Sequence, residues 1–527
     1  MAEKEQALTP ANANPWYVLM TLYGEQAGEV VDDELHEKNR AAWNAWAVHS
    51  KPSKRDEAVH FIPDLPSPDA WHNIGAEVRT MFEREFARRN PDVAVLTCPE
   101  PWGNDSIDMK KLYFTNQLSI SQFLIPKIVR LSESKFERQL VAQTAVFLGL
   151  ASFARSYFGG ITTFQNSKFC QVLDLRNSEF EEGLNLQSIK CVDLDLMDSR
   201  FSRDLTIADA ACSGLANMSQ MMPLRDAKWN LSGFQFSVLG ATYLNGTFVK
   251  GAVDFRHADF RWEFSAASLI AAGDVDFSKG RFAKDAHFTQ AKFAQSVSFF
   301  QTIFAGRAYF DGVVFAGSLS GTVNFQDCTF KEPTTFYGTK FVKLYPSFAG
   351  SILHDKTTFT DLSGNWPRDN PADSTQAKAC CATIRHNLGK QGLPEAEHFF
   401  FRREMEFAGQ IGGWWSRLPY RLFGWVSDYG YSILLPFLWL CLLIVGGGYA
   451  LAYGVAGSAA AVTFEQGLGL SFANVFNFLA FHKTFATEDF MAELPTWLKA
   501  FSGFQSIAGV VLLFFLGLGL RTRFRMR

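Results

Sequence analysis

Residues 275–293 read VDFSKGRFAKDAHFTQAKF, and their phenylalanines are spaced by five, six and five residues. Related spacing extends from about residue 106 to about residue 360. A step of five residues turns a side chain on an α-helix by roughly 140°, so a helix cannot keep these rings on one face. A flat strand fails as well, because odd and even steps alternate between its two faces. The spacing therefore predicts a coil with a corner after every such step, whose large side chains all point inward.

A small residue stands two positions before each large one, as Val275 does before Phe277 and Ala291 before Phe293. Residues two apart lie on the same side of an extended backbone. Polar residues and glycine, which suit corners and wet surfaces, fill the positions between these pairs. Each side of the coil is therefore predicted to turn one small and one large apolar group inward, with Lys292 and its equivalents outside.

The short segments that carry this pattern resemble those of the pentapeptide-repeat family, in the form where two five-residue units carry one extra residue. Examples are Ala258-Asp-Phe260, Ala291-Lys-Phe293 and Ala308-Tyr-Phe310. The resemblance covers roughly half of the chain. It implies a right-handed, four-sided β-helix with about 22 residues in each coil.

The fold class we expect is a β-solenoid, a right-handed quadrilateral β-helix, flanked by helices at both ends. The solenoid is expected over residues 106–360, where the repeat runs. Residues 1–105 lack the repeat, and their apolar residues recur at helical spacing. A β-helix exposes unpaired backbone groups at its ends, so we predict that this α-rich segment caps the first coil.

Two segments interrupt or follow the repeat. The phase is lost near residues 213–235, where Met221, Met222 and Pro223 occur, and this segment is predicted to be a loop ejected from the coil. Residues 361–428 are predicted to form a turn-rich linker, a helical hairpin and an aromatic, basic helix suited to a lipid interface. The hairpin also resembles the segment before the membrane spans of membrane-linked pentapeptide-repeat proteins.

Residues 429–527 are predicted to be a membrane module with two spans. The stretches 433–452 and 500–520 are uncharged and mostly apolar, and each reaches the roughly 20 residues that a helix needs to cross a bilayer. Arginines precede the first span and follow the second, whereas acidic residues dominate the segment between them. The positive-inside rule then predicts an inner (cytoplasmic) membrane protein with both termini in the cytoplasm. The residues that we assign to this orientation are Arg521, Arg523, Arg525 and Arg527.

Residues 466–481, between the spans, are apolar but too short to cross, which is typical of a re-entrant or interfacial helix. The segment also resembles the pore helix of two-span ion channels. However, His482-Lys483-Thr484-Phe485 stands where a potassium channel has Thr-Val-Gly-Tyr-Gly, and a lysine at a pore mouth repels cations. Both interpretations stay open, and the candidate pore or interfacial residues are Ser471, Asn474, Asn477, His482 and Lys483.

Composition narrows the function classes. A net charge of −3 argues against a protein that binds nucleic acid through its overall charge. The eight cysteines are scattered, without the spacing of a zinc site or a disulfide framework. No combination of nucleophile, base and orienting group can be recognised. We therefore expect no enzyme, with no catalytic residues, no cofactor and no metal.

Two functions remain. The first is a membrane-anchored cytoplasmic scaffold that presents a rigid β-helix as a protein-binding surface. The alternative is an oligomeric, two-span, ion-channel-like protein that its cytoplasmic β-helix gates or regulates. The expected partners are the lipid bilayer, an unidentified cytoplasmic protein and further copies of the same chain.

Overall fold

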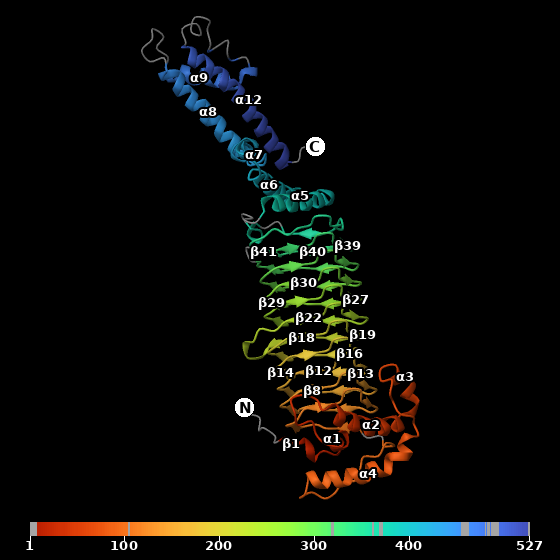
Figure 1. Ribbon diagram of the computed structural model, residues 1–527. Helices are drawn as coiled ribbons and strands as arrows, with labels where there is room; N and C mark the ends of the chain where they lie inside the picture. The colour runs from red at the N-terminus through yellow and green to blue at the C-terminus, as the bar shows by residue number, and fades with distance from the viewer. Residues whose placement is uncertain are drawn as a thin grey trace. The chain divides into compact units, whose positions relative to one another are not determined.

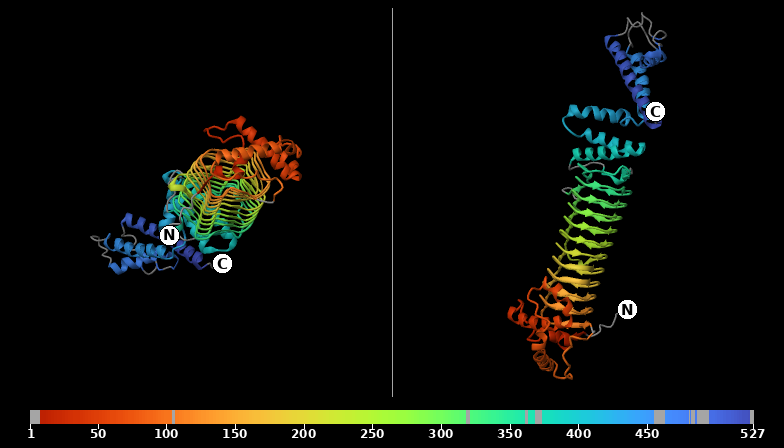
Figure 2. Two further views of the ribbon diagram at one scale, coloured as in Figure 1. Left: turned by 90° about the horizontal axis from the view of Figure 1, so that it is seen from below. Right: turned by 90° about the vertical axis from the view of Figure 1, so that its right-hand side faces the viewer.

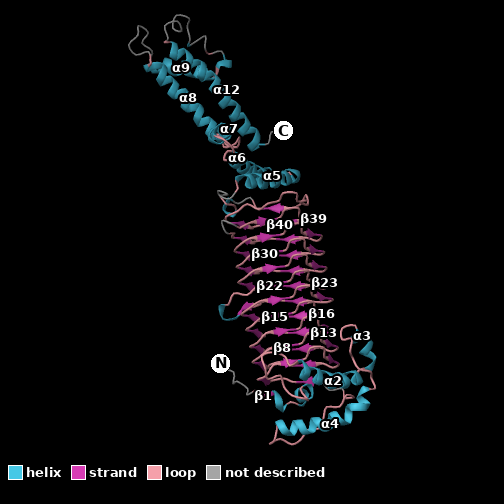
Figure 3. Ribbon diagram, in the orientation of Figure 1, coloured by secondary structure: helices cyan, strands magenta, loops and turns pink. Residues whose placement is uncertain are grey.

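The computed structural model divides into two compact units, Met1–Ala372 and Asp373–Arg527. It describes the chain except for residues 1–7, 104–105, 318–320, 361–362, 368–372, 455–462, 480, 482–484, 486–494 and 525–527. The first unit combines N-terminal helices with stacked short strands, and the second is built from helices (Figures 1 and 3).

The first unit is a parallel β-solenoid of roughly 11 turns. Each turn has four sides, and each strand pairs in parallel with strands of the turns above and below it, as Figure 2 shows from a second direction. Thr162 pairs with Leu140 and with Leu184, so one turn takes 22 residues there. The predicted fold class is confirmed: a β-solenoid, N-terminal helices and two apolar C-terminal helices are all present.

The first side of the solenoid consists of a 7-stranded sheet followed by a 5-stranded sheet. The first sheet contains β1 (Thr9–Pro10), β3 (Leu112–Phe114), β7 (Lys135–Phe136), β11 (Tyr157–Phe158), β14 (Glu179–Phe180), β17 (Arg200–Phe201) and β21 (Met222–Pro223). The second contains β25 (Phe248–Val249), β29 (Ile270–Ala271), β33 (Lys292–Phe293), β37 (Val314–Phe315) and β41 (Lys340–Phe341).

The second side is a single 10-stranded sheet. Its strands are β4 (Leu118–Ser119), β8 (Leu140–Val141), β12 (Thr162–Thr163), β15 (Leu184–Asn185), β18 (Leu205–Thr206), β22 (Leu231–Ser232), β26 (Val253–Asp254), β30 (Val275–Asp276), β34 (Val297–Ser298) and β38 (Val323–Asn324).

The remaining two sides form one 20-stranded sheet, because β13 (Lys168–Asp174) and β16 (Lys190–Asp195) run across a corner. The other strands are β2 (Ile107–Asp108), β5 (Leu124–Ile125), β6 (Val129–Arg130), β9 (Val146–Phe147), β10 (Ala151–Ser152), β19 (Ala211–Cys212), β20 (Ala216–Asn217), β23 (Ser237–Val238), β24 (Thr242–Tyr243), β27 (Asp259–Phe260), β28 (Phe264–Ser265), β31 (Arg281–Phe282), β32 (Ala286–His287), β35 (Ile303–Phe304), β36 (Ala308–Tyr309), β39 (Thr329–Phe330), β40 (Thr334–Phe336) and β42 (Thr358–Phe359).

Stacked aromatic rings fill the interior, as the spacing predicts. Phe293 is fully buried, whereas its neighbour Lys292 is exposed. On the first side, five phenylalanine rings lie one above another with centroids 4.4–5.2 Å apart, and Trp229 continues the stack 5.0 Å beyond Phe201. The five are Phe114, Phe136, Phe158, Phe180 and Phe201.

Two local features recur at the corners of the solenoid. A residue at alternate corners has a left-handed backbone conformation, and the small inward position that follows it often holds a buried hydroxyl, which can bond to the neighbouring turn. Ser156 Oγ, for example, donates to the carbonyl of Leu131 in the turn below at 3.0 Å. The corner residues recur every 11 positions, with φ between 55° and 60° at Lys111, Gln122, Glu133, Thr144, Arg155, Asn166 and Asn177.

The N-terminal helices cover the open edge of the first coil. Helix α2 (Asp33–Ser50) lies over it, and Trp43 Nε1 donates to the Leu124 carbonyl at 2.8 Å. The Asn44 side chain accepts from the Leu124 N–H at 2.9 Å and donates to the Gln122 carbonyl at 2.9 Å. These bonds satisfy strand-edge groups that would otherwise be unpaired. The remaining helices here are α1 (Pro15–Met20), α3 (Arg55–Val59) and α4 (Ala70–Arg89).

The structure corrects the predicted loop at residues 213–235. Strands β20 and β21 keep their parallel pairing inside this segment, and Met221 is fully buried. Leu205 pairs with Leu231 rather than with a residue 22 positions on, so only a short excess around the 3₁₀ turn η3 (Leu224–Asp226) leaves the coil. Methionine fills an inward position here, which a pattern read from phenylalanine does not reveal.

The segment predicted as a turn-rich linker begins by closing the solenoid. After the 3₁₀ turn η4 (Ser363–Asn365), the Trp366 ring stacks on Phe341 with centroids 4.7 Å apart. Trp366 Nε1 donates to the Thr360 carbonyl at 2.9 Å. The indole covers the last ring of the first side, so residues 363–367 belong to the solenoid.

The second unit begins with the predicted helical hairpin, α5 (Ser374–Gln391) and α6 (Pro394–Ala408). Arg385 on α5 and Glu404 on α6 join the two helices through an Nε–Oε2 contact of 2.8 Å. The amphipathic helix α7 (Trp414–Ser427) follows, with Trp414, Trp415 and Trp425 exposed.

Two helices in the described part of this unit are long and apolar enough to cross a membrane, α8 (Leu434–Tyr453) and α12 (Thr496–Phe524). A shorter helix, α9 (Phe464–Val475), packs against both of them and is followed by the 3₁₀ turn η5 (Asn477–Leu479). The segment predicted as one short helix over 466–481 is thus a helix that ends at Val475 and then a tighter turn.

Candidate functional site

A buried polar cluster lies where α8, α9 and α12 meet. Ser471, Asn474 and Gln505 are fully buried. Asn474 Nδ2 donates to Gln505 Oε1 at 2.9 Å, and Gln505 Nε2 donates to Ser471 Oγ at 2.8 Å and to the Leu443 carbonyl at 3.2 Å. The cluster therefore joins all three helices by hydrogen bonds inside a single chain.

Glycines allow the close approach that this cluster needs. A Cβ at Gly447 would overlap Gln505 Nε2 and would lie 2.6 Å from Ser471 Oγ. A Cβ at Gly448 would lie 2.9 Å from Leu468 Cα, and one at Gly509 would lie 2.9 Å from Val475 Cα. Small residues at helix contacts and polar side chains that bond across helices are the usual means of association in lipid.

The structure separates the residues assigned to the pore or interfacial segment. Ser471 and Asn474 belong to the polar cluster, whereas Asn477 is exposed in η5. His482 and Lys483 lie outside the described residues. Sequence reasoning missed Gln505, although a glutamine within an otherwise apolar span is itself a signal for a buried polar contact.

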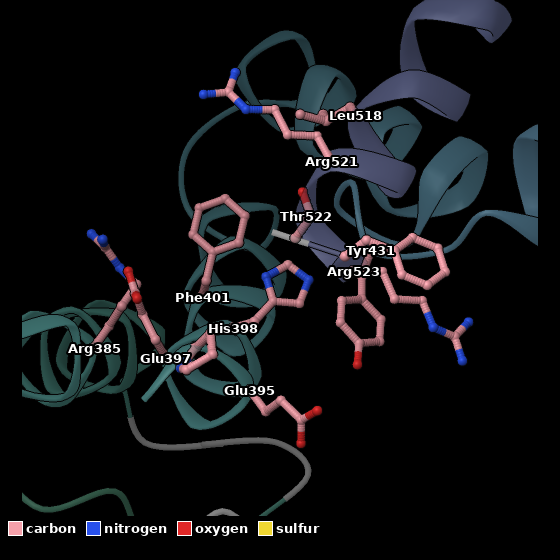
Figure 4. A pocket seen from close by; sticks show the side chains of 12 residues that line it. Arg385, Glu395, Glu397, His398, Phe401, Tyr431, Leu518, Arg521, Thr522 and Arg523 are labelled. Carbon is pink, nitrogen blue, oxygen red and sulfur yellow. The ribbon is translucent and has the colours of Figure 1, made fainter. Parts of the chain in front are cut away.

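A second feature of this unit is a cavity of about 870 Å³, which we call the α6–α12 pocket. Its walls come from Arg385 of α5, the start of α6, the residue Tyr431 before α8, and the last turns of α12 (Figure 4). Side chains that line it include His398, Phe401, Tyr431, Leu518, Arg521 and Arg523.

Close packing fixes the two helix ends that build the pocket. A Cβ at Gly519 would lie 2.8 Å from the Ser432 carbonyl, and one at Gly430 would lie 2.9 Å from Leu518. The end of α12 therefore lies directly beside the start of α8. Arg402 on α6 and Asp428, the residue that follows α7, form an ion pair of 2.8 Å. This ion pair holds the hairpin helix α6 beside the end of α7.

The charged side chains of the pocket differ in their partners. Arg385 is held by Glu404, whereas Arg521 and Arg523 are exposed and form no ion pair within the described residues. Glu395 and Glu397, in the first turn of α6, contribute acidic groups to the wall. The pocket thus combines two guanidinium groups that have no ion-pair partner in the described part of the chain with two acidic side chains on another wall.

His398 stands in the middle of the pocket (Figure 4). Its ring lies against Tyr431, with centroids 4.5 Å apart, and its buried Nε2 has no hydrogen-bond partner within the described residues. Burial, together with the positive charge of Arg402, lowers the pKa of His398 to about 4. The imidazole is therefore neutral near pH 7.

Of the four arginines assigned to membrane orientation, Arg521 and Arg523 line this pocket, and Arg525 and Arg527 lie outside the described residues. Sequence reasoning did not find the contribution of His398 and Tyr431, because no motif links them to the end of the chain. Within the described residues, no group of His, Cys, Asp and Glu side chains is placed to hold a metal ion.

The fold and these contacts define a class: a β-solenoid protein whose second unit carries two apolar helices of membrane-spanning length. No protein-family model, no curated protein and no solved structure matches the chain.

Proposed function

We propose that this protein is a membrane-anchored scaffold, in which α8 and α12 hold the chain in the inner membrane and the solenoid presents a rigid surface to a cytoplasmic protein. The observation that carries the proposal is the combination in one chain of a ring-filled solenoid and two apolar helices of membrane-spanning length. A solenoid offers long, regular faces for binding a protein. The 22-residue turn and the paired small and large inward residues support its assignment to the pentapeptide-repeat type.

One face of the solenoid is suited to such a partner. The strands β25, β29, β33, β37 and β41 contain no acidic residue. They turn Ile270, Lys292 and Lys340 outward, with Val342 exposed next to the last strand. Lys292 and Lys340 form no ion pair within the described residues. This basic and apolar face favours a partner with acidic and apolar side chains.

The polar cluster of the second unit supports an anchor rather than a pore. Ser471 Oγ accepts from Gln505 Nε2 and donates to the Leu443 carbonyl, and Asn474 Nδ2 donates to Gln505 Oε1, so both residues bond within the same chain. Asn474 Oδ1 has no hydrogen-bond partner within the described residues. A pore lined by these two residues in an oligomer would require the cluster to open. We therefore favour a non-conducting anchor over the channel-like alternative.

The test is a pull-down with the full-length protein in detergent, after the protein has been recovered from the membrane fraction. We expect a retained cytoplasmic protein whose binding is lost when Lys292 and Lys340 are both changed to Glu. The matched control changes Lys279 and Lys284, which are exposed elsewhere on the solenoid, to Glu and keeps the binding. A protein found only in the soluble fraction would contradict the anchor, and ion currents from reconstituted liposomes would favour the channel.

A further inference from the structure

We infer that Cys191 and Cys212 form an oxidation site, in which a peroxide converts two neighbouring thiols of the solenoid interior into a disulfide that joins two turns. The two residues lie on β16 and β19, in successive turns of the coil. The inference goes beyond the proposed scaffold function. It concerns the first unit alone and depends neither on the membrane anchor nor on the protein that the solenoid binds.

The first argument is strand register. Cys191 pairs in parallel with Cys212, so the two residues occupy equivalent inward positions one turn apart. Phe169 precedes them and Val238 follows them at the same position of the neighbouring turns. Adjacent strands lie about 4.8 Å apart, which is within the range of Cα–Cα distances that a disulfide can bridge. Two consecutive turns thus place a thiol where one covalent bond can join them.

The second argument is direct contact. Cys191 Sγ and Cys212 Sγ lie 2.9 Å apart, within hydrogen-bonding distance of each other. Both residues are buried, and both are free thiols in the structure. A sulfenic acid condenses with a neighbouring thiol to a disulfide. A sulfenic acid formed on either sulfur would therefore already touch the thiol with which it can react.

The third argument is access from solvent. A cavity of about 430 Å³ is lined by Glu57 of α3 and by residues of the solenoid, and both cysteines are among them. A water molecule takes about 30 Å³ of liquid volume, so hydrogen peroxide, which is only slightly larger, can enter this cavity. The cavity thus gives a small oxidant a route to two thiols that are otherwise enclosed.

The reaction consumes one hydrogen peroxide and releases two waters. Cys191 takes the first step, because it is 5% exposed and Cys212 only 1%. The Cys191 sulfur attacks one peroxide oxygen, the O–O bond breaks, one water leaves and Cys191 becomes a sulfenic acid. The Cys212 sulfur then attacks the Cys191 sulfur, the S–O bond breaks, and the departing hydroxide takes the Cys212 proton as the second water. The hydrogen bond with Cys191, followed by burial, raises the pKa of Cys212, so this thiol keeps its proton until that step.

The experiment treats the reduced full-length protein in detergent with hydrogen peroxide. The remaining thiols are then blocked with N-ethylmaleimide under denaturing conditions, and the protein is digested with trypsin. Trypsin cleaves after Arg200 and Arg203, which lie between the two cysteines, so each thiol is carried on its own peptide. We expect mass spectrometry to recover most of the two peptides as one linked species, lighter by two hydrogen atoms than their sum. Dithiothreitol should separate them again.

Two controls separate this pair from the other thiols. Cys328 is buried and its Sγ donates to the Phe299 carbonyl at 2.8 Å, so it should be recovered blocked by N-ethylmaleimide. Cys170→Ser removes the third thiol of the cavity and should leave the link between Cys191 and Cys212 intact. Recovery of both cysteines in the blocked form after peroxide treatment would overturn the inference. A link from Cys191 to Cys170, or a sulfinic acid on Cys191 without any link, would overturn it as well, because Cys212 would not be the reacting partner.

Discussion

At the scale of single residues, the solenoid separates neighbours in sequence into opposite environments. Phe293 is fully buried and lies over Phe315 with ring centroids 5.5 Å apart, whereas Lys292 points outward. We expect Phe293→Ala to reduce the free energy of unfolding by about 3–5 kcal/mol, because it removes a large ring from a packed stack. Lys292→Ala should change it by less than about 0.5 kcal/mol. Urea unfolding followed by circular dichroism measures both, and equal effects would contradict the inward register.

Glycines permit close contacts where helices of the second unit meet. Gly447 faces Gln505 and Ser471, whereas a Cβ at the adjacent Gly446 would meet nothing within 4 Å. We expect Gly447→Ala to destabilise the unit by about 1–3 kcal/mol through overpacking, despite the better helix propensity of alanine. Gly446→Ala should be neutral or slightly stabilising, because alanine has the better helix propensity and meets no neighbour at this position. Detergent-denaturation curves decide the matter, and a stabilising Gly447→Ala would rule out the close contact.

At the scale of elements, the hairpin helix α6 carries a titratable group into its contact with the start of α8. The pKa of His398 is lowered to about 4, chiefly by burial and then by Arg402. In the unfolded chain the imidazole takes up a proton near pH 6.5. Between these pH values the unfolded state binds more protons than the folded state. The contribution of neutral His398 to the free energy of unfolding is therefore fully present above about pH 6.5 and is lost as the pH falls toward 4.

We therefore expect the melting temperature of the second unit to fall between pH 7 and pH 5. His398→Phe keeps an aromatic ring against Tyr431 and should reduce this pH dependence. His386→Phe, at an exposed position of α5, serves as the control and should leave it unchanged. A pH profile that His398→Phe does not alter would assign the acid sensitivity to another group.

The elements also show what a sequence can and cannot predict. The coil was predictable because its interactions repeat: each inward ring meets its equivalent one turn away, so the period appears in the sequence itself. Trp229 stacks on Phe201 and Trp366 stacks on Phe341. Each of these contacts occurs once, so it does not appear as a repeat in the sequence. Met221 fills an inward position without being aromatic. Such single contacts depend on the assembled coil and leave no recurring pattern.

At the scale of the whole molecule, the same reasoning explains why the arginines were predicted but their pocket was not. The arginines that follow the second span can be recognised directly in the sequence. The pocket, in contrast, needs His398, which lies 123 residues before Arg521 in the sequence. The two come together through the packing of α12 beside the start of α8 and the ion pair of Arg402 with Asp428. Neither contact has a local sequence signal.

The packing of the two spans and the arginines beside them predict the orientation of the chain in the membrane. The end of α12 lies beside the start of α8, so the chain before the first span and the chain after the second must lie on the same side. Arginines flank both of these positions, and their excess favours the cytoplasmic side. A cysteine in place of Ser458, between the spans, should react in intact cells with a thiol reagent that cannot cross membranes. A cysteine in place of Ser53, exposed in the first unit, should react only after lysis. Labelling of Ser53→Cys in intact cells would invert the orientation, and it would move the solenoid and the α6–α12 pocket away from the cytoplasm.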